Sequence, residues 1–173
     1  RDRWATANRC AVLKQGYLEL IGIHRHGLPN PWSGLLARSE GAHILALRCN
    51  NADAVYPFIA ARCDDFDLPV QRRRMAPAGD REQEMRFRNI FSRDEHTPEC
   101  RYIIIEHQTP EVLWQPPLMN HPNGAYALSQ VTLCGKNDQA LANRWQALGA
   151  DRNDPAPTSV PLTSGKLIRR TQA

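Results

Sequence analysis

The sequence has no run of apolar residues that approaches the roughly 18 needed to cross a membrane as a helix. It also shows no signal peptide, because no apolar segment follows the opening Arg1-Asp2-Arg3-Trp4. The five cysteines are widely spaced and include no C-x-x-C pair, which argues against both a disulfide framework and a zinc finger. These absences predict a cytoplasmic protein with reduced thiols and no membrane partner.

A strong excess of one charge is also missing, since the net charge is +4 and acidic residues are mixed among the basic ones. This balance predicts no nucleic-acid partner, although an anionic ligand is compatible with it. Arg72-Arg73-Arg74 lies in a stretch punctuated by Pro69, Pro77 and Gly79, for which we expect a loop. The triplet is either a solvated loop, a nucleic-acid patch or a basic rim that attracts an anionic substrate.

Residues 41–108 form the stretch around which the chain is organised. An apolar strand over 42–49 contains His43, and Asn50-Asn51-Ala52-Asp53 supplies caps for a helix over about 53–63. We expect Pro57 in the first turn of that helix, where proline is tolerated, and a buried stripe of Val55, Phe58 and Ile59.

Two further strands complete this stretch. Partial alternation over 81–93 predicts a strand with one solvated face, and Ile103-Ile104-Ile105 marks a buried strand over 101–107. Side chains alternate along a strand, so Glu106 shares the face of Tyr102 and Ile104 while His107 points to the opposite face.

Shorter segments flank this stretch. Residues 8–23 read as a hairpin in which Glu19 shares a face with Tyr17 and Ile21, either as an exposed glutamate or in a metal or catalytic role. A loop over 24–40 opens with His24-Arg25-His26. A proline-rich connector over 109–124 is too apolar to be a free linker.

The C-terminal part repeats the pattern of the central stretch. A strand over 128–133 contains Gln130 and precedes a capped helix with Leu141, Trp145 and Leu148 on one face, then a short hairpin over 160–168. Gln130 matches His43 in this repeat, and the strand around Glu19 matches that around Glu106. The repeating unit is βαβββ, which predicts an α+β fold.

Two pairs of segments carry a more specific pattern. They are Ala5-Thr6-Ala7-Asn8-Arg9 with Gly16-Tyr17-Leu18-Glu19-Leu20-Ile21, and Glu106-His107-Gln108-Thr109-Pro110-Glu111-Val112-Leu113-Trp114 with His121-Pro122-Asn123-Gly124-Ala125. These segments resemble the bacterial glyoxalase-like domain proteins of the vicinal oxygen chelate superfamily. The resemblance implies a single domain over 1–173, divided into a partial first module over 5–23, a central module over 41–108, the connector over 109–124 and a partial third module over 125–173. A complete first module would need a strand and a helix before Asn8. We therefore expect a fragment, segments missing from the sequence, or a degenerate site.

The resemblance also implies that the modules form a curved mixed sheet, which makes a cup around a divalent ion with ligands Glu19, His43, Glu106 and Gln130. Zn, Ni, Mn or Fe would suit this mixed oxygen and nitrogen set. The expected substrate is a small molecule with vicinal oxygens, handled by lyase, isomerase or dioxygenase chemistry, with Glu106 or Glu19 moving a proton. The alternative is a non-catalytic binding or sequestration protein of the same fold. The pairing of modules in this superfamily also allows a homodimer.

Overall fold

The computed structural model describes residues 5–30, 32–37, 41–135, 139–150, 153, 159–162 and 165–171. The chain divides into two compact units. Unit 1 comprises Arg1–His43 and Trp114–Ala127, and unit 2 comprises Ile44–Leu113 and Leu128–Ala173. No helix in the described ranges has the length and apolar character that a membrane crossing requires.

Unit 1 is built on the hairpin of β1 (Thr6–Val12) and β2 (Tyr17–Ile23), which confirms the hairpin predicted from the sequence. Gly16 makes the turn with a φ of 96°, a conformation that glycine adopts without strain. The unit also holds the short helix α1 (Ser33–Leu36) and the 3-10 helix η1 (Pro116–Met119).

The part of the connector in unit 1 is tied to the hairpin. The Trp114 Nε1–H donates to the Leu13 carbonyl at 3.0 Å, and the Trp114 ring meets Tyr17 edge-on at 6.0 Å. Nε2 of His121 lies 2.7 Å from the Val12 carbonyl. These contacts agree with the expectation that the connector is not a free linker.

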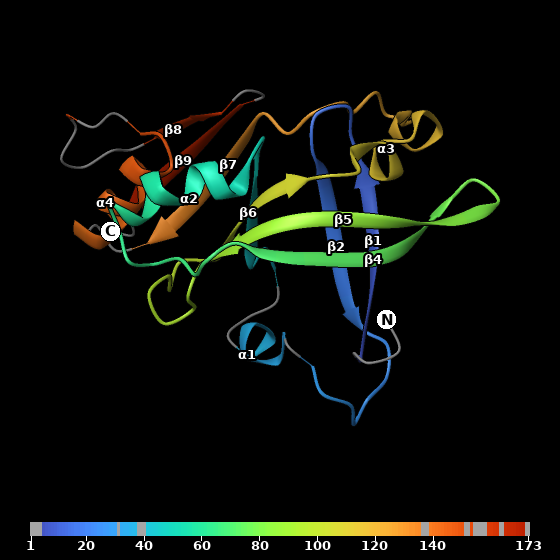
Figure 1. Cartoon of the computed structure of the whole chain (residues 1–173), viewed down its shortest axis with the longest axis horizontal. Coiled ribbons are helices and arrows are strands. Elements are labelled where there is room, and N and C mark those ends of the chain that lie inside the picture. The colour runs from blue at the N-terminus through green and yellow to red at the C-terminus, as the bar shows by residue number, and fades with distance from the viewer. Residues whose placement is uncertain are drawn as a thin grey trace. The chain divides into compact units, whose positions relative to one another are not determined.

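The first half of unit 2 is a βαβββ module, as predicted. It runs β3 (Ile44–Cys49), α2 (Ala52–Ala60), β4 (Val70–Ala78), β5 (Arg81–Phe91) and β6 (Arg101–His107). The sheet order is β3-β6-β5-β4, with β3 parallel to β6 and the other pairs antiparallel. In Figure 1, β4 and β5 continue as a long ribbon beyond β3 and β6. The short helix α3 (Pro110–Leu113) follows and packs against β5 and β4.

Helix α2 covers one face of this sheet. Asn51 caps it by accepting a hydrogen bond from the Ala54 N–H. Its Ala52 and Ile59 join a core whose fully buried members include residues of β5 and β6, namely Ile90, Tyr102 and Ile104. This core fixes which face of the sheet the helix occupies.

Two predictions for α2 were wrong. Phe58 is 64% exposed, because the buried side of the helix is set by Ala52, Val55 and Ile59. Pro57 lies inside the helix as its sixth residue, since the helix begins at Ala52. The missing N–H leaves the carbonyl of the exposed Asp53 without its helical donor, which is tolerable where water can replace it.

The loop predicted for Arg72-Arg73-Arg74 was also wrong, because the triplet lies in β4 and pairs with β5 over the whole strand. β4 is an edge strand, where a proline such as Pro77 is tolerated because one side of the strand has no neighbour that needs its N–H groups. Three consecutive arginines interrupt the alternation of apolar and polar residues that is typical of a half-buried strand, so the sequence did not indicate a strand here.

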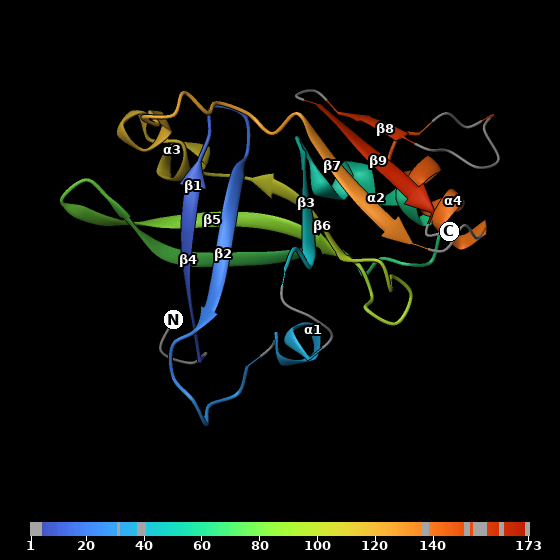
Figure 2. The same cartoon turned by 180° about the vertical axis from the view of Figure 1, so that it is seen from behind.

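The second half of unit 2 is a shorter version of the same module. It runs β7 (Gln130–Gly135), α4 (Gln139–Ala147), β8 (Ser159–Leu162) and β9 (Gly165–Thr171), in the sheet order β7-β9-β8 (Figure 2). The parallel β7–β9 pair corresponds to β3–β6, and the antiparallel β8–β9 hairpin was predicted. Leu141, Trp145 and Val160 form its core. The strand expected over 128–133 begins only at Gln130.

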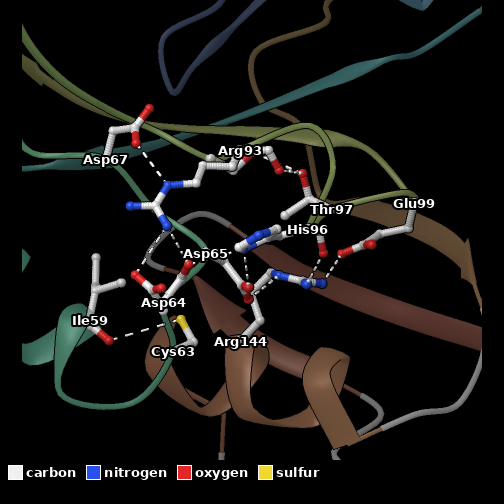
Figure 3. A network of polar contacts seen from close by, with 11 residues as sticks. Ile59, Cys63, Asp64, Asp65, Asp67, Arg93, His96, Thr97, Glu99 and Arg144 are labelled. Carbon is white, nitrogen blue, oxygen red and sulfur yellow. Dashed lines mark hydrogen bonds and ion pairs between the residues drawn. The ribbon is translucent and has the colours of Figure 1, made fainter.

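A buried ion-pair network joins α4 to the first module of unit 2 (Figure 3). Arg144 is 1% exposed, and its guanidinium pairs with Asp65 at 2.9 Å and with Glu99 at 2.5 Å. It also donates to the His96 carbonyl at 2.5 Å and lies over the Tyr102 ring. Both carboxylates therefore have a partner despite their burial.

Candidate functional site

The sheet β3-β6-β5-β4 has two faces of different chemistry. Register places Leu45, Leu47, Tyr102, Ile104 and Ile90 on the face that α2 covers. We call the opposite face the arginine face. Its central residues are Ala46, Arg48, Val70, Arg72, Arg74, Met85, Phe87, Asn89, Phe91, Ile103, Ile105 and His107.

The acidic side chains of the four strands all lie on one face, whereas arginines lie on both. The acidic residues of these four fully described strands are Glu82, Glu84 and Glu106, and alternation places all three on the α2 side. The arginine face carries Arg48, Arg72 and Arg74 without a strand carboxylate beside them. This face therefore favours an anion.

Aromatic rings occupy the side of the arginine face formed by β4 and β5. The Arg72 guanidinium lies 5.6 Å from the centroid of the Phe91 ring, and that of Arg74 lies 5.9 Å from Phe87. Such cation–π contacts hold the arginines against the sheet. The His107 ring meets Phe87 edge-on at 5.5 Å, so the imidazole has a fixed aromatic neighbour.

His107 is an uncharged imidazole at neutral pH. Burial is the larger cause and the nearby positive charge of Arg48 the smaller one, and together they lower its pKa to about 4. A neutral imidazole has one N–H donor and one acceptor nitrogen. His107 can thus bind either kind of polar group without adding charge to the face.

Asn89 contributes a buried carbonyl oxygen. The residue is 9% exposed, and its Oδ1 has no hydrogen-bond partner in the part of the chain that the structure describes. Asn89 pairs with Ile105, which in turn pairs with Arg48, so these three residues form one row across β5, β6 and β3. His107 and Phe87 occupy the next row.

Two residues expected as metal ligands lie in unit 2. Glu106 is the residue before the last in β6 and lies on the α2 side. Its Oε2 accepts a hydrogen bond from the Ala52 N–H at 2.9 Å, and its Oε1 accepts one from the Gln108 side chain at 3.2 Å. Gln130 is the first residue of β7, and its side-chain amide donates to Thr132 at 3.0 Å.

The other two expected ligands lie in unit 1. Glu19 is exposed on β2, and its Oε1 accepts a hydrogen bond from the Asn8 amide at 2.5 Å. His43 immediately precedes β3 instead of lying within it, and its Nε2 is buried without a partner among the described residues. Within the described part of either unit, no three His, Cys, Asp or Glu side chains gather as a metal site requires.

His24-Arg25-His26 is exposed, as expected for a loop. His24 borders a shallow hollow of about 270 Å³ on the hairpin of unit 1, lined also by Ala7, Asn8, Arg9, Leu20, Gly22 and Ile23. This hollow is open and lacks a buried polar group, so we do not take it as the site.

Sequence reasoning missed Asn89 and Arg48 as candidate residues. Alternation placed His107 and Glu106 on opposite faces of the sheet, and the site was predicted on the face of Glu106 because a carboxylate is a metal ligand. Tyr102 and Ile104 share that face and could have been matched with the apolar stripe of the helix. A face that packs against a helix has little room for a ligand.

Comparison with known proteins gives one match. Residues 1–149 match a family model described as "Glyoxalase-like domain". No curated protein and no solved structure matches the chain significantly.

Proposed function

Since the chain belongs to the glyoxalase-like domain family, part of the vicinal oxygen chelate superfamily, we propose that it binds a small molecule on the arginine face of the four-stranded sheet. The observation that carries this proposal is the buried Oδ1 of Asn89, which lacks a donor in the described structure and lies diagonally across from His107. An unsatisfied buried polar group costs about 1–3 kcal/mol, which a ligand donor would recover.

The apolar surroundings support the same conclusion. Met85, Ile103 and Ile105 are buried on this face, and they surround a small number of polar groups. Ligand sites commonly combine an apolar lining with a few placed polar groups and a perturbed pKa. The arginine face has each of these features.

A metal-dependent enzyme acting on vicinal oxygens is our second candidate. The partnerless Nε2 of His43 favours it, because a neutral imidazole nitrogen is a common metal ligand. The ligand set Glu19, His43, Glu106 and Gln130, with Zn, Ni, Mn or Fe, stays a proposal. The Glu106 carboxylate does not fit it well, because Ala52 and Gln108 already bind its oxygens. We therefore derive no catalytic step through a metal.

The first test is a nuclear magnetic resonance screen of small metabolites against the purified chain. We expect at least one compound to shift both the side-chain amide of Asn89 and the imidazole of His107. Shifts confined to other residues, or no shift with any compound, would reject the arginine face as the binding site.

The second test separates the two candidates. Metal content is measured by mass spectrometry, and the screen is repeated after treatment with chelator. A stoichiometric ion that is lost in the His43→Ala and Glu19→Gln variants supports the enzyme. Unchanged ligand binding after chelation supports the binding protein. A homodimer and a cytoplasmic location also remain proposals, and light scattering of the same sample measures the first.

A further inference from the structure

We propose that the outer edge of β4 binds an extended acidic segment of a partner protein, which adds to the four-stranded sheet as a further strand. The inference is independent of the small-molecule site, because it concerns the edge of the sheet. β4 lies at that edge, and β5 is the strand that pairs with it in the described part of the chain (Figure 1). In an antiparallel pair, the backbone N–H and C=O groups of alternate residues point away from the neighbouring strand. The edge of β4 therefore presents backbone donors and acceptors to an added strand.

The first seven residues of β4 are suited to strand addition. β4 pairs with β5 in an unbroken register, so its backbone is held extended. The side chains of Gln71, Arg72 and Arg73 are exposed. The Gln71 side-chain amide reaches the Arg72 carbonyl at 3.4 Å, a long hydrogen bond that a backbone N–H of the added strand would replace. Pro77 has no N–H to donate, so we place the added strand along residues 70–76.

The charge of β4 selects the partner. The strand contains Arg72, Arg73 and Arg74 and no acidic residue. The Arg73 side chain is 74% exposed, and its ion pair with Glu84 is long, at 4.0 Å. Pairing two β4 edges around this triplet would bring arginines of both copies together, which disfavours a second copy as the partner. An acidic strand would place carboxylates beside the same guanidiniums.

A like-charge pair within the sheet supports the same conclusion. Arg73 lies directly opposite Arg86 of β5, and both side chains are exposed on the same face. Like charges directly opposite each other destabilise a strand pair. The neighbouring Arg88 is paired with Asp53, whereas Arg86 forms no ion pair with any described residue. A carboxylate beside Arg73 would relieve the repulsion between Arg73 and Arg86.

The register also predicts the sequence of the acidic segment. A residue opposite Arg73 on the added strand lies on the face of Arg73, and its two neighbours lie opposite Arg72 and Arg74 on the other face. Three consecutive acidic residues therefore match three consecutive arginines. The Arg72 and Arg74 guanidiniums already lie over the Phe91 and Phe87 rings, so pairing costs them little further side-chain entropy. β-Branched residues on either side would favour the extended conformation.

Calorimetric titration of the whole chain with synthetic peptides tests the inference. The acidic probe is Thr-Val-Glu-Glu-Glu-Val-Thr with both ends blocked. One control peptide has glutamine in place of glutamate. The other carries an N-methyl group on each glutamate, which keeps the charge but removes the backbone donors. We expect the acidic probe to bind at least tenfold more tightly than either control, and to slow hydrogen exchange at alternate amides of residues 70–76.

A triple variant of the chain provides a second measurement. Replacing the three consecutive arginines of β4 with glutamine should weaken the acidic probe at least tenfold. The matched control replaces Arg25, Arg62 and Arg81 with glutamine, which removes the same charge outside β4 and should change the affinity less than twofold. Thermal unfolding establishes that both variants fold. The comparison of peptides on the unmodified chain holds even where a variant does not.

Three results would overturn the inference. The first is no binding of the acidic probe to the unmodified chain. The second is equal binding of either control peptide, because strand addition needs both the carboxylates and the backbone donors. The third is tighter binding of a short oligothymidylate than of the acidic probe, which would make the arginines a surface for nucleic acid.

Discussion

The Glu106 carboxylate accepts a hydrogen bond from the backbone N–H of Ala52, the first residue of α2. The free N–H groups of a helix N-terminus carry partial positive charge, so a carboxylate placed there is stabilised. Beside it, Arg88 forms a bidentate contact with Asp53, which holds the same end of α2 to β5. The residue expected to bind a metal thus anchors a helix.

Glu106→Ala should therefore lower the free energy of unfolding by about 1–2 kcal/mol, as for the loss of a charged hydrogen bond. Glu106→Gln should cost less, because the amide oxygen still accepts from Ala52. Urea denaturation measures both. The control is Glu82→Ala, an exposed glutamate on the same face, for which we expect a change within about 0.5 kcal/mol. An unchanged midpoint in Glu106→Ala would leave the metal-ligand role as the better account.

The order of helices and strands in the central module could be predicted because each element has its own local signal in the sequence. The Asn51 cap, the helical spacing and the run of isoleucines each mark one element, and alternation alone separates Glu106 from His107. Which face of the sheet the helix covers could not be predicted from such local signals. It depends on α2 packing against Tyr102 and Ile104, which is a contact between residues about fifty positions apart.

The strand β4 and the buried side chain of Asn89 are two further features that the local sequence could not predict. β4 is an edge strand with little burial, so nothing in its own residues distinguishes it from a loop. Asn89 is an ordinary polar residue in the sequence, and its importance arises only because register sets it beside the buried Ile105. Local patterns predict elements, whereas burial of a polar atom is a property of the pairing between them.

Arg144→Ala should destabilise unit 2 by about 3–5 kcal/mol, because it leaves the carboxylates of Glu99 and Asp65 buried without their cation. Arg93 provides a matched comparison in the same network. It pairs with Asp64 and Asp67, which are largely exposed, so Arg93→Ala should cost about 0–1 kcal/mol.

Thermal and urea unfolding of the two arginine variants measure this difference. The double variant Arg144→Leu with Glu99→Gln should recover part of the loss, since it removes one of the buried charges together with its partner. Equal costs for the Arg144 and Arg93 variants would contradict the reading of Arg144 as the buried centre of the network.

The pH dependence of stability should carry the signature of His107. Its folded pKa of about 4 lies below the ordinary 6.5, so the unfolded chain binds the proton first as the pH falls. The stabilisation is fully present above about pH 6.5 and is lost progressively towards pH 4. It amounts to on the order of 3 kcal/mol, at about 1.36 kcal/mol for each pKa unit.

Urea denaturation between pH 4 and 7.5 measures this effect, with His107→Gln as the variant that lacks the titrating ring. The difference in stability between wild type and variant should change across that window, while carboxylates contribute equally to both. A resonance titration of the His107 imidazole checks the same pKa directly. A midpoint near 6.5 would contradict the burial of the ring beside Arg48.

Asn89→Leu should separate stability from binding. Leucine has a similar size but no polar atom, so the variant removes a buried oxygen that lacks a donor in the described structure. We expect unfolding free energy equal to or above that of the wild type, by up to about 1–3 kcal/mol. The same change should weaken the ligand found in the screen at least tenfold. If Asn89→Leu destabilised the chain and left ligand affinity intact, the amide would be a structural group and the arginine face would lose its main support.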